Sequence, residues 1–273
     1  MSPSVPYTRL LAHLTPMGRV AVAFSGGVDS TLLLHAAVEA LGTANVLALT
    51  AASRVLPRQE LEDSRAFTAS RGLRHEFVDI DPLAQEEVRA NDPRRCYFCK
   101  QLIFSHLLQR AKTAGFDSLI DGTNADDALD YRPGTQAARE LGVRSPLEEA
   151  GLGKADIRAL GRQAGLPGWD KPPLTCYLTR FPYGTTITAE RLHQVSRCEE
   201  FLASRGFTGF RVRYHDQVAR LEMSPDQFQR LLDPSLRHEV IATCRQAGFT
   251  YVALDLDGYR QGSLNPTGLS ANS

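Results

Sequence analysis

The chain has 273 residues, of which 42% are hydrophobic and 23% charged, so its composition is that of a globular protein and excludes wholesale disorder. Basic and acidic residues number 31 each, and this zero net charge favours neither nucleic acid nor an anionic membrane as a general partner. No apolar run reaches the roughly 18 residues of a membrane span, and no secretory signal is recognisable. Five cysteines are too few for a disulfide framework. We therefore expect a cytoplasmic protein.

Apolar runs and amphipathic segments alternate through the first half of the sequence. The apolar runs predict strands over residues 20–24, 45–50, 75–80 and 118–121. The segments between them predict helices over residues 30–41, 57–72 and about 97–114. Strands separated by helix-length segments predict an α/β fold, with a parallel sheet covered by helices on both faces. Such sheets place their functional sites at the carboxyl ends of the strands.

A different pattern begins after residue 134. Short helices are predicted over residues 137–141 and 154–164, and the four prolines of residues 166–184 predict a long ordered loop. A helix over 188–205, strands over 210–214 and 217–222, two helices and a last strand over 250–254 predict a smaller α+β unit. We therefore expect two domains, residues 1–185 and 186–273, with a boundary defined to within about ten residues.

The segment SGGVDS, between the first predicted strand and its helix, has the features of a phosphate-binding loop. Its residues are Ser25, Gly26, Gly27, Val28, Asp29 and Ser30. The two glycines allow a ligand to approach the backbone, and the following amides lie at the positive end of the helix dipole. An aspartate beside bound phosphate would be repelled without a cation between them, so Asp29 suggests Mg²⁺. A simple helix cap is the alternative, but the strand–loop–helix context favours phosphate binding.

SGGVDS is not a Walker loop, because no Gly-Lys-Ser/Thr follows, and it lacks the third glycine of a dinucleotide fingerprint. It resembles the PP-loop of the ATP pyrophosphatase superfamily, whose members cleave ATP to AMP and pyrophosphate and activate an oxygen by adenylation. The resemblance implies that adenosine lies near Ser53, after the second predicted strand, and near Gly122, after the fourth. The carboxylates that follow, Asp126, Asp127 and Asp130, are interpreted equally well as a solvated turn or as a metal or substrate contact.

Four of the five cysteines fall into two groups. Cys198 and Cys244 lie among apolar residues of predicted helices, so we expect both in the core. Cys96 and Cys99 form a Cys-x-x-Cys at the start of a predicted helix. Such a pair is compatible with a zinc half-site, a redox pair or part of an iron–sulfur site, and one pair alone does not distinguish these.

The fifth cysteine, Cys176, lies in the proline-rich loop, where Lys171 and Arg180 would favour its thiolate. An exposed cysteine without a role is the alternative. The loop sequence KPPLTCYLTRFPYG, with PLEEAGLGKADIRALGRQAGLPGW before it and RVRYHDQVARLE and YVALDLDGYRQGSLN after it, resembles the LarE group of PP-loop proteins. This match covers nearly the whole chain and is much more specific than SGGVDS alone.

The resemblance implies an ATP-dependent sulfur transferase. LarE proteins convert the carboxylates of pyridinium-3,5-biscarboxylic acid mononucleotide to thiocarboxylates, on the route to the nickel-pincer nucleotide cofactor. In sacrificial members, the cysteine at the Cys176 position loses its sulfur and becomes dehydroalanine. In three-cysteine members, which the trio Cys96, Cys99 and Cys176 resembles, a 4Fe-4S cluster delivers the sulfur, and we favour this route here. The resemblance also implies a small-molecule nucleotide substrate and a homo-oligomer.

A substrate with a phosphate and two carboxylates requires cationic contacts. The candidates are Arg180, Arg211, Arg213 and Arg260. Arg211 and Arg213 alternate on a predicted strand and so share one face, and the resemblance favours phosphate binding by this pair. Glu200 and Glu222 are a further candidate pair, for a cation in the smaller domain.

Three other functions are compatible with a PP-loop. A tRNA thiolation enzyme generally needs a broad basic surface, which the zero net charge disfavours. A synthetase in which ammonia attacks the adenylate gives no role to Cys96, Cys99 or Cys176. A protein that binds nucleotide without catalysis would not need Asp29 and an intact loop.

Overall fold

The computed structural model describes residues 5–129, 133–170, 175–260 and 263–264. The chain divides into two compact units. Unit 1 comprises residues 1–82 and 96–174, and unit 2 comprises residues 83–95 and 175–273. This division differs from the expected boundary near residue 185 in two respects. The segment around Cys176 belongs to unit 2, and so does the segment of residues 83–95, which lies between two parts of unit 1 in the sequence.

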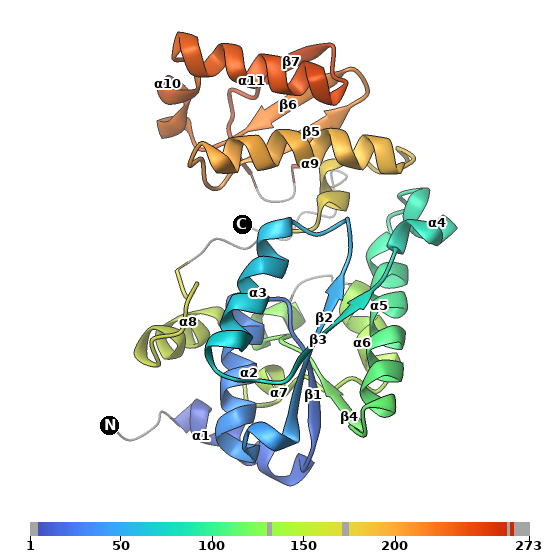
Figure 1. Ribbon diagram of the computed structural model, residues 1–273, viewed down its shortest axis with the longest axis vertical. Coiled ribbons are helices and arrows are strands. Elements are labelled where there is room, and N and C mark those ends of the chain that lie inside the picture. The colour runs from blue at the N-terminus through green and yellow to red at the C-terminus, as the bar shows by residue number, and fades with distance from the viewer. Residues whose placement is uncertain (1–4, 130–132, 171–174, 261–262, 265–273) are drawn as a thin grey trace. The chain divides into compact units, whose positions relative to one another are not determined.

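Unit 1 is built on a four-stranded parallel sheet in the order β3-β2-β1-β4 (Figure 1). Its strands are β1 (Val20–Ala23), β2 (Val46–Ala52), β3 (His75–Asp79) and β4 (Ser118–Ile120). Its helices are α1 (Val5–Leu14), α2 (Val28–Leu41), α3 (Arg58–Ser70), α5 (Arg95–Thr113), α6 (Pro133–Glu140), α7 (Pro146–Glu149) and α8 (Lys154–Gln163). The predicted α/β architecture is therefore confirmed, and α1 and α7 are additions to the predicted elements.

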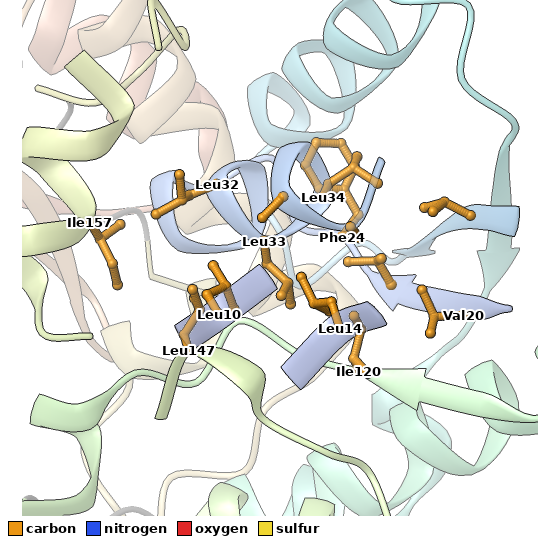
Figure 2. Close-up of a cluster of buried hydrophobic side chains, with 14 of the residues drawn as sticks. Leu10, Leu14, Val20, Phe24, Leu32, Leu33, Leu34, Ile120, Leu147 and Ile157 are labelled. Carbon is orange, nitrogen blue, oxygen red and sulfur yellow. The ribbon is translucent and has the colours of Figure 1, made fainter. Parts of the chain in front are cut away.

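Helices cover both faces of this sheet because successive side chains of its central strands alternate between two hydrophobic cores. Val20 and Val22 of β1 belong to one core, which includes Leu10 and Leu14 of α1 and the leucines of α2 (Figure 2). Ala21 belongs to the other core, which is closed by Phe104, Leu107 and Ala111 of α5 and by Ala138 of α6. Strands buried on both faces appear in a sequence as uninterrupted apolar runs, which is why β1 and β2 were predictable.

Unit 2 contains a three-stranded sheet in the order β5-β6-β7. Its elements are α4 (Glu86–Arg89), α9 (Ala189–Ser204), β5 (Arg211–His215), β6 (Val218–Glu222), α10 (Phe228–Leu231), α11 (Pro234–Ala247) and β7 (Tyr251–Leu254). β5 and β6 pair antiparallel, whereas β6 and β7 pair parallel. The Thr188 and Asp233 side chains cap the N-termini of α9 and α11, and Gly248 ends α11 in the left-handed region with a φ of 112°.

The hydrogen bonds of Asn91 explain why the segment of residues 83–95 belongs to unit 2. Its side chain is fully buried and donates hydrogen bonds to the carbonyl oxygens of Phe181 and Pro182, at 3.4 and 2.6 Å. The Gly184 amide donates in return to the Asn91 carbonyl oxygen at 3.1 Å. These bonds hold Asn91 at a φ of 59°, which non-glycine residues rarely adopt. No local sequence pattern signals such a long-range contact.

Candidate functional site

The PP-loop lies between β1 and α2 and is held by its own serines. The Oγ atoms of Ser25 and Ser30 are 3.2 Å apart, and the Gly27 amide donates to the Ser25 Oγ at 3.3 Å. Gly27 is the N-cap of α2, so the first amides of this helix lie directly after the loop. Gly26 has a φ of 79°, and a Cβ there would be 3.2 Å from the Glu60 carbonyl oxygen of α3. A glycine is required at residue 26 for both its conformation and its space.

The structure places Gly122 against the PP-loop, and its contact with adenosine stays a prediction. β4 lies beside β1 in the sheet, so the turn after β4 reaches the start of α2. A Cβ on Gly122 would be 2.9 Å from the Ser30 amide nitrogen and 3.2 Å from its Cα. Ser53 follows β2, the other neighbour of β1, at the carboxyl edge of the same sheet. Its Oγ accepts a hydrogen bond from the Val55 amide at 3.4 Å.

Asp29, in the first turn of α2, is surrounded by unit 1 residues that sequence analysis did not identify. The Lys154 Nζ forms a salt bridge with Asp29 Oδ2, and the Asn124 amide donates to the same oxygen at 3.5 Å. The second oxygen, Oδ1, is buried and has no hydrogen-bond partner within the described ranges. Burial raises the pKa of Asp29, although Lys154 opposes this change. A divalent cation would satisfy the unpaired oxygen, so the Asp29 carboxylate fits the Mg²⁺ that the sequence suggested.

Two of the three carboxylates after Gly122 organise the chain beside Asp29. The side chain of Asp127 accepts hydrogen bonds from the backbone amide and the side-chain amide of Asn124, at 3.2 and 3.0 Å. Asp126 Oδ2 accepts from the Lys154 backbone amide at 2.7 Å and so holds the start of α8. The third carboxylate, Asp130, lies outside the described residues.

None of the five cysteines, all of which lie in the described part of the chain, forms a disulfide. Cys96 and Cys99 lie half-buried in the first turn of α5 in unit 1, whereas Cys176 lies half-buried in unit 2, before the 3₁₀ turn Tyr177–Arg180. Cys198 and Cys244 are buried, which confirms that they are core residues. Their mutual hydrogen bond, together with burial, raises the pKa of the Cys198 thiol and keeps it unreactive.

The predicted metal ligands are distributed over both units. Among the residues that the structure describes, no group of three or more His, Cys, Asp or Glu side chains is arranged to hold a metal ion. Lys171, which was expected to favour the Cys176 thiolate, lies outside the described residues.

Arg180 connects the Cys176 segment to the interior of unit 2. Its guanidinium is 1% exposed and forms a double salt bridge with Glu199 of α9, at 2.7 and 2.9 Å. It also donates to the Cys176 carbonyl oxygen at 3.3 Å and to the Thr175 hydroxyl at 2.6 Å. Burial alone would lower the pKa of Arg180, but the charges of Glu199 and Cys176 contribute to a net rise. Arg180 thus positions the backbone of Cys176 and presents a fixed positive charge to its side chain.

Arg211 and Arg213 of β5, together with Arg180, form what we call the arginine cluster. Glu199, the partner of Arg180, also accepts from the Val212 amide between the other two arginines, and Arg213 donates to the Thr179 carbonyl oxygen at 2.7 Å. Burial lowers the pKa of Arg211, and repulsion by Arg180 and Arg213 adds to this effect. The Arg211 guanidinium lies 4.9 Å from the ring centroid of Tyr259. Arg213 bonds to Glu222 at 2.8 Å. The fourth candidate, Arg260, is instead exposed and pairs with Asp257 at 3.0 Å.

The structure gives Glu222 and Glu200 different surroundings. Glu222 is completely buried and forms salt bridges with Arg213 and with Arg220, the latter at 3.0 Å. Glu200 is exposed on α9, whereas its neighbour Glu199 is buried and accepts bonds from Arg180 and from the Val212 amide. A cation held by Glu200 and Glu222 therefore remains a prediction, and Glu199 is a residue that sequence analysis missed.

Comparisons with known proteins show which proteins this chain is similar to. The family described as NAD synthase matches residues 11–100, which include the PP-loop. An uncharacterized protein of Synechocystis is 43% identical over 249 residues, covering 91% of this chain and 92% of that protein. The pyridinium-3,5-bisthiocarboxylic acid mononucleotide synthase of Lactiplantibacillus plantarum is 38% identical over 258 residues, covering 94% and 93%. A tRNA-specific 2-thiouridylase of Brucella ovis is 33% identical, covering only 54% of this chain and 46% of its own length.

Proposed function

The chain belongs to the LarE family of PP-loop proteins, and from this membership we propose that it is an ATP-dependent sulfurtransferase. Its substrate in this proposal is pyridinium-3,5-biscarboxylic acid mononucleotide, whose carboxylates become thiocarboxylates for the nickel-pincer cofactor. The observation that carries the proposal is the 38% identity to the named synthase, because it runs through 94% of this chain and hence through both units. Similarity to the tRNA thiouridylase of Brucella ovis covers only 54% of the chain, so it supports the PP-loop chemistry and not the tRNA substrate.

Unit 1 supplies the activation step. A carboxylate oxygen of the substrate attacks the α-phosphorus of ATP, the bond to the bridging oxygen breaks and pyrophosphate leaves. Residues Ser25–Ser30, with amides at the start of α2, would hold the departing pyrophosphate. The unpaired Asp29 Oδ1 supports a Mg²⁺ ion beside it, and such an ion neutralises phosphate charge when bound. Ser53 and Gly122 are proposed to contact the adenosine, since both follow strands that neighbour β1.

Unit 2 is proposed to supply sulfur and to hold the substrate. Cys176 is half-buried and not part of a disulfide, and Arg180 fixes its backbone. In the sacrificial route, its thiolate attacks the acyl-adenylate and displaces AMP. Loss of the α-proton and cleavage of the Cβ–S bond then release the thiocarboxylate and leave dehydroalanine. Arg211 and Arg213 are the proposed phosphate contacts, with Arg260 as an exposed addition.

We favour an iron–sulfur cluster as the sulfur donor. The chemistry of the donor set suits such a group, because Cys96, Cys99 and Cys176 are three half-buried cysteines that form no disulfide. A 4Fe-4S cluster would be held by the thiolates of Cys96, Cys99 and Cys176, and it would supply the sulfide for transfer.

Three further features complete the proposal. The enzyme acts on a small nucleotide and not on nucleic acid, in agreement with its zero net charge. It works as a homo-oligomer in the cytoplasm, where ATP is supplied and thiols stay reduced. Separately, no helix within the described ranges is both long and apolar enough to cross a membrane.

The decisive experiment incubates the protein with ATP, Mg²⁺ and the pyridinium biscarboxylic acid mononucleotide, and separates the products by chromatography. We expect AMP, pyrophosphate and a thiocarboxylate, whereas ADP or no product would contradict the proposal. The mass of the protein after turnover then identifies the sulfur donor. Loss of one H₂S at Cys176 indicates sacrifice, and an unchanged mass, with iron–sulfur absorbance after anaerobic reconstitution, indicates the cluster. A Cys96→Ala variant separates the routes again, because only the sacrificial route tolerates it.

A further inference from the structure

The PP-loop has no lysine of its own, yet the structure supplies one from elsewhere in unit 1. In a Walker loop, the lysine that follows the last glycine reaches the β- and γ-phosphates. The corresponding segment here, SGGVDS, contains no cationic residue. Lys154 comes from α8, and its Nζ forms a salt bridge with Asp29 inside the loop.

Lys154 is held in this position by its backbone. It is the first residue of α8, and its amide donates to Asp126 Oδ2 at 2.7 Å. The preceding residue, Gly153, packs so closely that a Cβ there would be 2.9 Å from Asp126 Oδ1. The Ala125 amide donates to the Leu152 carbonyl oxygen at 2.9 Å and ties the same two segments together. The chain after β4 therefore fixes the root of the Lys154 side chain, while its charged end is free to change partner.

The charges of the site favour such a change of partner. The Lys154 side chain is 41% exposed and the Asp29 side chain 20% exposed, so solvent reaches this salt bridge and the ammonium group is not locked in a packed core. A triphosphate in the loop would bring negative charge beside Asp29, and the aspartate would then need a metal ion as its counter-charge. Lys154 would be released at the same time, within reach of the phosphates.

We propose that Lys154 is a nucleotide-binding residue that exchanges Asp29 for the β- and γ-phosphates when ATP and Mg²⁺ enter the PP-loop. This inference rests on the proposed function only in that ATP is the bound nucleotide. Because AMP has no β- or γ-phosphate, Lys154 contributes to the binding of ATP and pyrophosphate and not to that of AMP.

The test compares ATP and AMP binding to the full chain by isothermal titration calorimetry with Mg²⁺ present. Replacement of Lys154 by methionine (Lys154→Met) removes one charged contact, so the dissociation constant for ATP should rise about 10- to 100-fold. That for AMP should change by less than about threefold, within the normal effect of a surface substitution. Lys154→Arg, which keeps the charge, should recover much of the ATP affinity. Lys112→Met removes an exposed lysine at the end of α5 and should leave both constants unchanged.

Other outcomes would overturn the inference. Equal losses for ATP and AMP would show that Lys154 only supports the fold of the loop, and no loss for ATP would exclude a phosphate contact. Thermal unfolding of each variant separates binding from folding, and Lys154→Gln replaces any methionine variant that fails to fold. The measurement does not depend on sulfur transfer. Lys154→Met can weaken ATP binding and not AMP binding, as expected, even if the wild-type protein makes no thiocarboxylate. In that case the role of Lys154 in nucleotide binding is supported and the proposed function fails.

Discussion

The PP-loop of unit 1 and the arginine cluster of unit 2 both contain charged side chains, but the partners that neutralise these charges differ. In unit 1, the Lys154–Asp29 salt bridge is partly exposed, and one Asp29 oxygen is buried without a partner in the described chain. In unit 2, Arg180 and Arg213 each have a buried glutamate partner, Glu199 and Glu222 respectively. Unit 1 therefore has charge available for a ligand, whereas much of the charge in unit 2 already stabilises the fold. The comparison predicts that substitutions in unit 2 act first on stability and those in unit 1 first on binding.

The largest effect is expected from Glu222→Ala. This change leaves Arg213 and Arg220 facing a buried site without their carboxylate, and breaking a buried ion pair costs about 3–5 kcal/mol. Urea unfolding followed by circular dichroism measures the loss. Glu200→Ala, an exposed change in the same unit, should cost at most about 0.5 kcal/mol. A loss for Glu222→Ala as small as that of Glu200→Ala would contradict the comparison.

Gly122→Ala tests unit 1, and a smaller effect on stability is expected. The new Cβ would lie 2.9 Å from the Ser30 amide nitrogen, which is rigid backbone, so the PP-loop must shift. We expect a destabilisation of about 1–3 kcal/mol and weaker ATP binding. Gly134→Ala is the matched control, because its Cβ would also meet an atom at 2.9 Å, but on the flexible Lys100 side chain. If both variants bind ATP like the wild type, the turn after β4 is not part of the nucleotide site.

A third prediction concerns pH and His75, the first residue of β3, whose ring contacts that of Phe24 just before the PP-loop. Its two ring nitrogens are each 2.8 Å from a threonine hydroxyl, those of Thr50 and Thr68, and burial lowers its pKa to about 4. Because an unfolded histidine has a pKa of about 6.5, the unfolded chain binds the proton more tightly between these values. The contribution of the neutral His75 ring to the free energy of unfolding is therefore fully present above about pH 6.5, and it is lost as the pH falls towards 4.

Urea midpoints measured between pH 4 and 7 check this dependence. His75→Gln should lower stability at pH 7 and flatten its decline at acidic pH, since the titrating ring is gone. His106→Gln, at an exposed site on α5, should keep the wild-type slope. An unchanged slope in His75→Gln would assign the acid sensitivity to other groups. Because His75 is only half-buried, solvent screening reduces the size of the effect below that of a fully buried group.

These cases show which parts of the protein a sequence can predict. The sheet of unit 1 and the PP-loop follow from local patterns, because burial on both faces produces apolar runs and the loop needs two adjacent glycines. Lys154 was not predicted, because its role depends on a contact with a residue 125 positions earlier. Glu199 was missed for a different reason. It lies between Val195 and Leu202 on the buried side of α9, so helical phase could have identified it as a buried carboxylate.

The smallest effect on stability is expected from Arg260→Ala, and this makes the variant a sensitive probe of substrate binding. Arg260 is 60% exposed and forms an ion pair with the exposed Asp257, and such pairs contribute about 0–1 kcal/mol. If Arg260 contacts the substrate phosphate, its loss should raise the KM for the pyridinium mononucleotide about tenfold while the KM for ATP stays constant. Asp257→Ala is the control, because it removes the partner and keeps the cation, so the KM should not rise. A constant KM in Arg260→Ala would remove Arg260 from the substrate site and leave phosphate binding to the buried arginine cluster.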